Sequence, residues 1–345
     1  MTSVYRMRPV QDVRWDDLLN RHPDASVFHT HAWLDALHRT YGYASEGFTT
    51  SPPGDALQNA IVVSRVKSWI TGSRLVSISF ADACQPLVSS GQELNSLVRA
   101  IQEVCREEGH KYVEFRWLNI DVQKSIDGLD PARSYIYHVM NIREDLETIF
   151  RAFHKSCIQR KIRRAEKEKL EYGVGSSDEM LREFYRLLIT TRRRHRLPPQ
   201  PFAWFRNLRD CFGGSFRIRI ARKAGRPLAS ILTLRYKQSL VYKYGCSDAR
   251  FHHLGPMPWL FWRAVQEAKE QWLSEFDLGR SDLTDHGLIA FKNHLGASAA
   301  ALTNYRYPRE AARASSHVLR LGKACEYLPP SILRAAGTLL YRHVG

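Results

Sequence analysis

The sequence has no cysteine pattern of the kind that builds a disulfide framework or a metal site. Its six cysteines are Cys84, Cys105, Cys157, Cys211, Cys246 and Cys325, and none forms a CxxC pair. Cysteines scattered in this way favour a reducing compartment. Because the cysteines also lack the spacing of a metal-binding motif, we expect no metal site.

Long apolar runs and nucleophile motifs are also missing. No stretch approaches the ~20 apolar residues that a membrane-spanning helix requires, and the N-terminus, MTSVYRMRPVQDVRW, lacks the apolar core of a signal peptide. These two absences predict a cytoplasmic protein. There is no G-x-S-x-G motif, and no cysteine has a motif-level partner, which argues against a covalent enzyme intermediate.

Acidic residues are few compared with basic ones. The 345 residues include 51 Lys and Arg against 35 Asp and Glu, which leaves a formal net charge of +16. The excess is spread over several segments, so we expect anionic partners such as RNA, phosphorylated sugars or an acidic membrane surface. A hydrophobic content of 44% is enough to build two domain cores of ordinary size.

The two halves of the chain repeat one order of elements. In the first half, residue patterns predict hairpin strands at 60–66 and 74–81, a helix at 92–108 and a closing strand at 112–117. In the second half, strands begin at 216, 228 and 239, a helix spans 257–272, and a closing strand begins at 275. This repeat predicts two similar α/β domains packed side by side. We place them at 1–145 and 146–310, followed by a helical tail at 311–345.

A strongly basic segment lies between the halves. Residues 150–170 predict an amphipathic helix, and a second cluster, Arg192 to Arg196, ends the helix that follows. The residues that we expect to contact RNA backbone or pyrophosphate are Arg160, Lys161, Arg163, Arg164 and Arg193. The alternative is a solvated charged face with no ligand.

The stretch FDLGRSDLTDHGLIAFKNHLGASAAAL at 276–302 predicts a buried strand, a polar loop and a short helix. Glu275–Leu278 would form the strand, and Gly287 would open a helix that turns Lys292 toward the loop. Arg280 and Lys292 would then carry two cations into one crevice beside Ser281, which suits a phosphate-bearing substrate. In the alternative interpretation, Asp277 pairs with Arg280 while Lys292 lies in solvent.

The tail from residue 312 predicts two basic amphipathic helices separated by Pro329 and Pro330. Such helices could lie on an anionic bilayer surface and bring the protein to a lipid-linked substrate, as a peripheral protein of the inner face of the plasma membrane. They could equally pack back onto the domains.

Three segments carry a family resemblance: FDLGRS with its FK-x-x-x-G turn, KSCIQRKIRRAEKEKLEYG at 155–173, and YKYGCSDARFHHLGPMPWLFWRAV at 242–265. They resemble the FemAB-like (peptidoglycan bridge aminoacyltransferase-like) branch of the GNAT acyltransferase superfamily, close to its CelD/BcsL-type and exopolysaccharide-associated members. The resemblance implies two tandem GNAT domains, each with a mixed, mostly antiparallel sheet flanked by helices. One departure is clear. After Arg250 the chain reads FHHLGPM, whereas ordinary GNAT enzymes have a Q/R-x-x-G-x-G/A loop for coenzyme A.

The resemblance implies transfer of an aminoacyl or acyl group to an amine of a cell-envelope or polysaccharide precursor. The co-substrate would be aminoacyl-tRNA or acyl-coenzyme A, with no bound cofactor, and the acceptor would be phosphorylated or lipid-linked. Alternatives are an acyl-coenzyme A-dependent N- or O-acyltransferase of exopolysaccharide synthesis and a non-catalytic RNA- or membrane-binding module.

Positioning would supply most of the acceleration in such a transfer, and a weak base would remove a proton. For that chemistry we nominate Asp82, Asp277 and Tyr244. The residues that we expect to bind substrate are Tyr242, Ser247, Arg280, Ser281 and Lys292.

Overall fold

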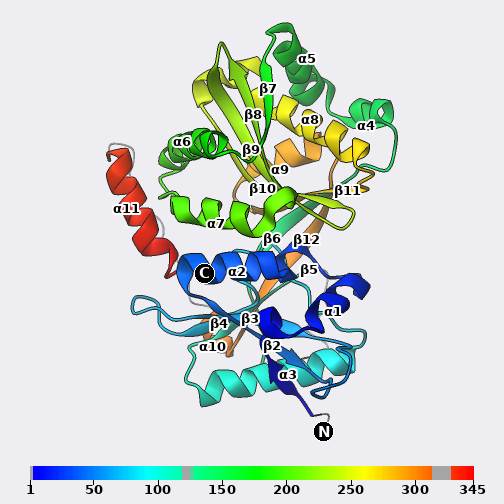
Figure 1. Ribbon diagram of the computed structural model, residues 1–345, viewed down its shortest axis with the longest axis vertical. Helices are drawn as coiled ribbons and strands as arrows, with labels where there is room; N and C mark the ends of the chain where they lie inside the picture. Colours follow the sequence, from blue (N-terminus) through cyan, green and yellow to red (C-terminus); the bar gives the residue numbers. More distant parts are fainter. Residues whose placement is uncertain (1–2, 119–125, 127, 313–327) are drawn as a thin grey trace. The chain divides into compact units, whose positions relative to one another are not determined.

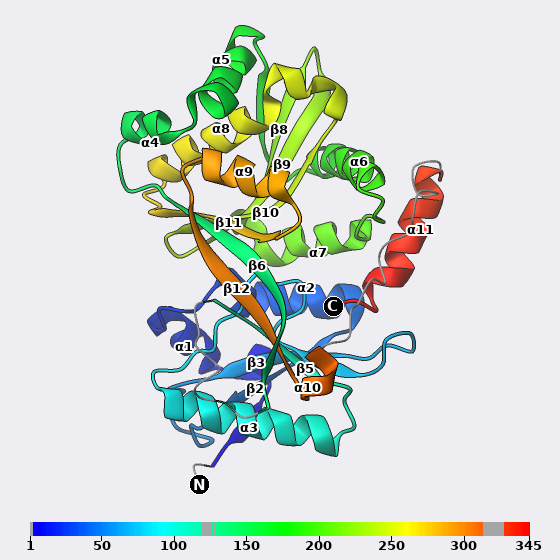
Figure 2. The same ribbon diagram turned by 180° about the vertical axis from the view of Figure 1, so that it is seen from behind.

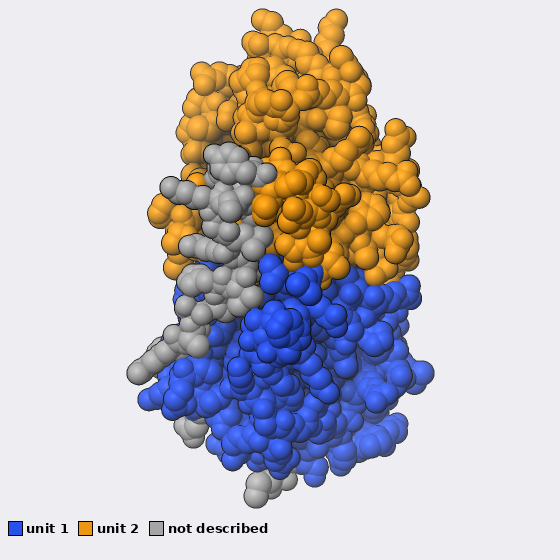
Figure 3. Space-filling view, turned by 90° about the vertical axis from the view of Figure 1, so that its left-hand side faces the viewer, with its two compact units in different colours: residues 1–135, 300–318, 339–345 blue, residues 136–299, 319–338 orange. Residues whose placement is uncertain are grey.

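The computed structural model describes residues 3–118, 126, 128–312 and 328–345 (Figure 1). The chain forms two compact units, coloured separately in Figure 3. Unit 1 contains residues 1–135, 300–318 and 339–345, and unit 2 contains 136–299 and 319–338. The predicted boundary lies after residue 145, and residues 300–310 were predicted to belong to the second domain.

Unit 1 is built on a sheet with the strand order β1-β2-β3-β4-β5-β12. Its elements are β1 (Tyr5–Met7), α1 (Trp15–Arg21), α2 (His31–Tyr41), β2 (Ala44–Thr49), β3 (Ile61–Val66), β4 (Arg74–Val76), α3 (Gly91–Glu107), β5 (Val113–Leu118), β12 (Ser298–Tyr307) and α10 (Arg309–Ala312). Helix α3 begins where Ser90 and Glu93 form a capping box. Its predicted apolar stripe is buried against Val63 and Phe115 of the sheet.

The second hairpin strand of unit 1 is shorter than predicted. Strand β4 pairs antiparallel with β3 but ends at Val76, whereas the sequence pattern predicts a strand to residue 81. Ile78 and Phe80 have φ values of 30° and 59°, and backbone in this region cannot continue a strand. Asp82 therefore follows an irregular segment and not a strand end.

Unit 2 has the strand order β6-β11-β10-β9-β8-β7. Its elements are the part of β6 (Asp130–Asn141) from residue 136 on, α4 (Leu146–Ala152), a π-helical turn (Lys155–Gln159), α5 (Arg160–Lys167), β7 (Glu171–Gly175), α6 (Asp178–Arg194), α7 (Phe202–Phe212), β8 (Phe216–Lys223), β9 (Arg226–Tyr236), β10 (Ser239–Ser247), a 3-10 turn (Ala249–Leu254), α8 (Pro256–Glu270), β11 (Glu275–Asp282) and α9 (His286–His294). Figures 1 and 2 show α8 and α6 on opposite faces of this sheet.

Two expectations about unit 2 are corrected. The basic segment 150–170 is not one helix, because α4 ends at Ala152 and the chain restarts in the π-helical turn after His154. The strand predicted to end at Leu278 continues to Asp282, since Gly279 takes a φ of 67° that lets the chain bend without leaving the sheet.

The repeated order of elements is confirmed. In unit 1, β3 and β4 pair antiparallel and β4 pairs parallel with β5 after helix α3. In unit 2, β9 and β10 pair antiparallel and β10 pairs parallel with β11 after helix α8. Each unit then takes its next strand from the other half of the sequence. Residues 302–307 of β12 pair with β5, and β6 is the neighbour of β11.

The described part of the tail is divided between the units: residues 328–338 belong to unit 2, and residues 339–345 belong to unit 1. Helix α11 (Pro330–Tyr341) buries Leu333 in unit 2, and a Cβ added at Gly337 would lie 1.9 Å from the carbonyl oxygen of Pro199. After residue 338 the chain joins unit 1, where the Arg74 guanidinium donates to the carbonyl oxygen of His343 at 2.8 Å. The first predicted tail helix lies outside the described residues, except for Leu328. Among the described helices, none combines the length and the apolar character needed to cross a membrane.

The packing of α11 predicts that one Gly→Ala substitution in this helix destabilises the protein, which is opposite to the usual effect. Gly→Ala inside a helix normally stabilises by about 1 kcal/mol. Gly337→Ala should instead lower the free energy of unfolding by about 1–3 kcal/mol, because its Cβ would overlap backbone of Pro199. Thr338→Ala, on the exposed neighbour, is the control and should not destabilise. Equal stability of both variants in denaturant titrations, with unchanged hydrogen exchange of α11, would contradict this packing.

Candidate active site

Strand β10 separates from β11 partway along its length. The two strands pair from Ser239↔Glu275 to Val241↔Asp277, whereas β10 remains paired with β9 as far as Ser247. A register shift between Tyr242 and Tyr244 marks a bulge at the point of separation. Beyond it, β10 offers side chains and backbone groups to a space that β11 does not fill.

The bulge also sends two tyrosines to opposite faces of the sheet. The Tyr242 ring packs against Phe261 of α8, with centroids 4.9 Å apart. Tyr244 is buried on the other side, where its hydroxyl accepts from Trp204 Nε1 of α7 at 2.8 Å. Regular alternation along a strand would place both tyrosines on one face, but strict alternation is lost at a bulge.

A cavity of about 890 Å³ opens beside this stretch of β10, entirely within unit 2. Its walls are the β10 segment 242–247, the start of α8, the end of α6, the turn before α5, and α9. Aromatic and apolar side chains such as Tyr242, Met257 and Phe291 form part of the lining, and charged groups lie among them. A largely apolar lining with a few polar and charged groups is typical of ligand-binding pockets.

Positive charge dominates the ionic groups of the cavity. Lys161 of α5 and Arg192 and Arg194 of α6 line it, against the single carboxylate of Asp285. The N-terminus of α8 also begins in the wall, at Pro256, and helix N-termini attract anions. These features suit a phosphate or another anionic group.

Gly255 brings Lys161 to the start of α8. Gly255 has a φ of 75°, and a Cβ there would lie 2.2 Å from the carbonyl oxygen of Lys161. Only glycine permits both the left-handed conformation and this approach of α5.

Ser247 and His252 form a hydrogen-bonded pair in the cavity wall. Ser247 Oγ lies 2.8 Å from His252 Nε2, and Ser247 N donates to Thr191 Oγ1 at 2.9 Å. Partial burial and the positive charges of Arg194 and Lys161 lower the pKa of His252, which Asp248 raises less strongly. These causes together favour the neutral form of the imidazole. It can accept a proton directly or through the Ser247 hydroxyl.

The predicted crevice residues near the end of β11 are mostly buried. Lys292 is 2% exposed, and its Nζ donates to the carbonyl oxygens of Gly279 and Arg280 at 2.9 and 3.1 Å. Asp277 accepts from the Tyr137 hydroxyl at 2.5 Å and from Gly279 N at 2.7 Å. Ser281 is also buried. Their contacts hold α9 and β6 against the bend in β11, and a role in binding substrate stays a prediction.

The other predicted residues divide between places. Tyr242, Ser247 and Lys161 line the cavity. Tyr244 lies in the core beside α7, and Asp82 belongs to unit 1. Arg193 donates to the carbonyl oxygen of Leu328 at 2.7 Å. Three further basic residues are exposed on the surface of α5, namely Arg160, Arg163 and Arg164.

Sequence reasoning did not nominate His252, Arg192 or Arg194 as site residues. The two arginines belong to the cluster that it noted, but the choice of Arg193 within that cluster depended on a helix phase that sequence alone does not determine. His252 follows Ser247 with no motif-like spacing. The bulge in β10 and the 3-10 turn bring the two together.

Comparisons with known proteins agree with this fold. Residues 152–292 match the model of the Acetyltransferase (GNAT) domain. The UDP-N-acetylmuramoylpentapeptide-lysine N(6)-alanyltransferase of Weissella viridescens is 28% identical over 148 residues, which are 41% of this chain and 42% of that protein. The matched part thus spans less than half the length of this curated relative.

Solved structures resemble nearly the whole chain. The crystal structure of FemX matches with a TM-score of 0.69 and 14% identity, covering 89% of this chain and 98% of that one. A tandem GNAT protein from the clavulanic acid biosynthesis pathway matches with a TM-score of 0.57 and 12% identity, covering 91% and 99%. The fold is therefore a tandem GNAT fold. Together with the alanyltransferase match, these likenesses confirm the resemblance to the FemAB-like branch.

The contacts of Lys292 predict a stability defect on its removal. Lys292→Ala should lower the free energy of unfolding by about 2–4 kcal/mol, because two buried carbonyls lose a charged donor and a cavity is left. Lys269→Ala is the matched control. Its Nζ also donates to a backbone carbonyl, that of Arg143, but at a more exposed position, so a loss below about 1 kcal/mol is expected. Unchanged stability with a raised KM for the acceptor would instead make Lys292 a substrate-binding residue.

Proposed function

We propose that this protein transfers an aminoacyl group from aminoacyl-tRNA to an amine of a cell-envelope precursor, forming an amide. The observation that carries the proposal is the cavity of unit 2, in which cations from α5 and α6 flank a neutral Ser247–His252 pair. The alanyltransferase relative, whose name specifies a UDP-linked muramoyl pentapeptide, supports this choice of acceptor.

The geometry supplies the groups that the transfer needs. The attacking amine must be unprotonated, and His252 can take a proton from it as the new C–N bond forms. The ester bond to the tRNA ribose breaks at the same carbonyl carbon, and the proton passes to the leaving ribose oxygen. Lys161, Arg192 and Arg194 would hold phosphate groups of the donor or acceptor in the cavity.

Aminoacyl-tRNA is favoured over acyl-coenzyme A as the donor for two reasons. The exposed cations Arg160, Arg163 and Arg164 lie on α5, beyond the cavity-lining Lys161, and RNA has phosphates to reach them while a compact cofactor has few. The loop before α8 is a 3-10 turn, Ala249–Leu254, with a different sequence from the usual coenzyme A loop.

Helix α11 supports a peripheral contact with an anionic membrane. Ile332 and Leu339 are 49% and 54% exposed and stand two helical turns apart, while the helix buries Leu333. Arg334 and Arg342 are exposed beside them. We propose that this apolar ridge meets the bilayer surface, where a lipid-linked acceptor would be found.

The membrane contact is tested with Ile332→Ser/Leu339→Ser. The double variant should lose flotation with vesicles that contain an anionic lipid, because the exposed apolar ridge is removed while the docked face of α11 is kept. Neutral vesicles are the control. Equal flotation of wild type and variant would exclude the α11 surface as the membrane contact.

A direct assay distinguishes the donors. Protein is mixed with labelled alanyl-tRNA or acetyl-coenzyme A, each with UDP-N-acetylmuramoyl-pentapeptide, and the product is identified by mass spectrometry. We expect an alanyl adduct from alanyl-tRNA, with donor affinity that falls steeply as salt rises. Product from acetyl-coenzyme A alone would replace this proposal with acyl-coenzyme A-dependent transfer. Binding of tRNA without turnover of any acceptor would favour a non-catalytic module.

The role of His252 predicts a pH dependence. The pKa of His252 is lowered by partial burial and by Arg194 and Lys161, so the ring is neutral above this lowered pKa. Activity should fall as the pH drops through it and the ring becomes charged. His252→Gln should reduce kcat by about 100-fold or more and remove this limb of the profile. His253→Gln, on the neighbouring histidine that does not line the cavity, should retain both. An unchanged profile in His252→Gln would assign the base elsewhere.

A further inference from the structure

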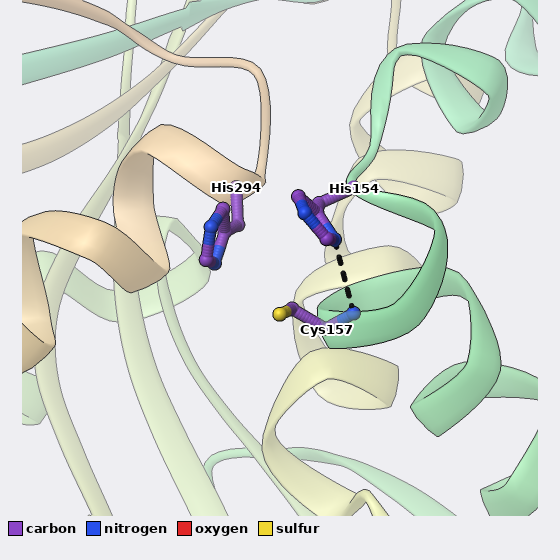
Figure 4. Close-up of side chains that lie close together, drawn as sticks. All are labelled: His154, Cys157 and His294. Atoms are coloured by element: carbon purple, nitrogen blue, oxygen red, sulfur yellow. Dashed lines mark hydrogen bonds between the residues drawn. The ribbon is translucent and has the colours of Figure 1, made fainter.

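Three side chains of types that can ligate a metal lie close together in unit 2 (Figure 4). His154 precedes the π-helical turn, Cys157 lies within it, and His294 ends α9. One ligand atom from each residue lies within 4.8 Å of the other two. The two imidazole rings have centroids 4.4 Å apart, and His154 N donates to the carbonyl oxygen of His294 at 2.9 Å. This backbone bond fixes the end of α9 beside the turn.

We propose that His154, Cys157 and His294 form a binding site for a divalent transition metal of the Zn²⁺ class. Two imidazole nitrogens and a thiolate are a ligand set that such ions prefer over Mg²⁺ or Ca²⁺. In a tetrahedral site the donors are about 3.3–3.8 Å apart, given bonds of about 2.0–2.3 Å. Side-chain rotations that move the ligand atoms by about 1 Å would therefore bring the three atoms to coordinating distance.

Three protein ligands leave one coordination position for a water or a substrate oxygen. Cys157 and His294 both line the cavity described above, so the open position would face it. The thiolate would also offset part of the positive charge that Lys161, Arg192 and Arg194 place there. The site is an addition to the proposed transfer function and does not depend on it.

Metal binding would change the start of the π-helical turn. His154 Nδ1 accepts from Cys157 N at 3.2 Å and lies 3.3 Å from Ser156 Oγ. Coordination through Nδ1 takes this lone pair, and coordination through Nε2 requires a proton on Nδ1. In either case the ring gives up the bond from Cys157 N, so the metal should alter hydrogen exchange at that amide. Affinity should rise with pH, because the ligands must be unprotonated.

Co²⁺ is the probe for the test, because its thiolate complexes absorb in the near ultraviolet and its geometry shows in the visible spectrum. Purified full-length protein should bind one Co²⁺ per chain with a thiolate charge-transfer band, and Zn²⁺ should displace it. Cys157→Ser should abolish the band. His154→Ala and His294→Ala should each weaken Co²⁺ affinity by more than about 100-fold, because removal of a ligand costs more than removal of a residue that only hydrogen-bonds to a ligand.

Matched controls use residues outside the cluster. Cys211→Ser and His253→Ala should bind Co²⁺ as the wild type does, since neither residue belongs to the site. Wild-type protein gives a second measurement that needs no variant: Zn²⁺ should protect Cys157 from alkylation, as read by peptide mass spectrometry. Absence of the charge-transfer band, its persistence in Cys157→Ser, or alkylation of Cys157 at the same rate with and without Zn²⁺ would overturn the proposal.

Discussion

The separation of β10 from β11 after Val241 is the constraint on which the rest of unit 2 depends. Pairing through Val241↔Asp277 keeps the sheet continuous at one end, and the bulge at the next residues turns β10 away at the other. If the two strands paired throughout, Ser247 would lie inside a sheet and the cavity would be closed. Helices α5, α6, α8 and α9 instead meet around the space that the strands leave.

Charge placement follows from the same geometry. The ends of α5 and α6 bring cations to one side of the cavity. Partial burial, together with the charges of Arg194 and Lys161, lowers the pKa of His252 and favours its neutral form. In the proposed transfer reaction the same charges would serve twice, because cations that attract phosphate also disfavour protonation of His252. Anion binding and the protonation of His252 would then be linked through Lys161 and Arg194.

Sequence reasoning reached the parts of the structure that local periodicity encodes. The order strand, strand, helix, strand is visible in both halves because each element is continuous and its apolar spacing is regular, as in the stripe of α3. The bulge in β10 leaves no such trace, because regular alternation of the sequence would put Tyr242 and Tyr244 on one face. Strands β6 and β12 were missed because their partners are distant in the sequence. The pairs His154–His294 and Ser247–His252 likewise depend on turns and on packing between elements.

The return of β12 to the first unit has a consequence for how the protein is made. Residues 302–307 supply the strand beside β5, and they leave the ribosome only after almost all of unit 2 has been synthesised. Until then the β5 edge lacks this partner, and an uncovered edge invites pairing with other chains. The sheet of unit 1 is therefore incomplete until β12 has been synthesised. Folding of the first half of the chain during translation would be finished only when the second half supplies this strand.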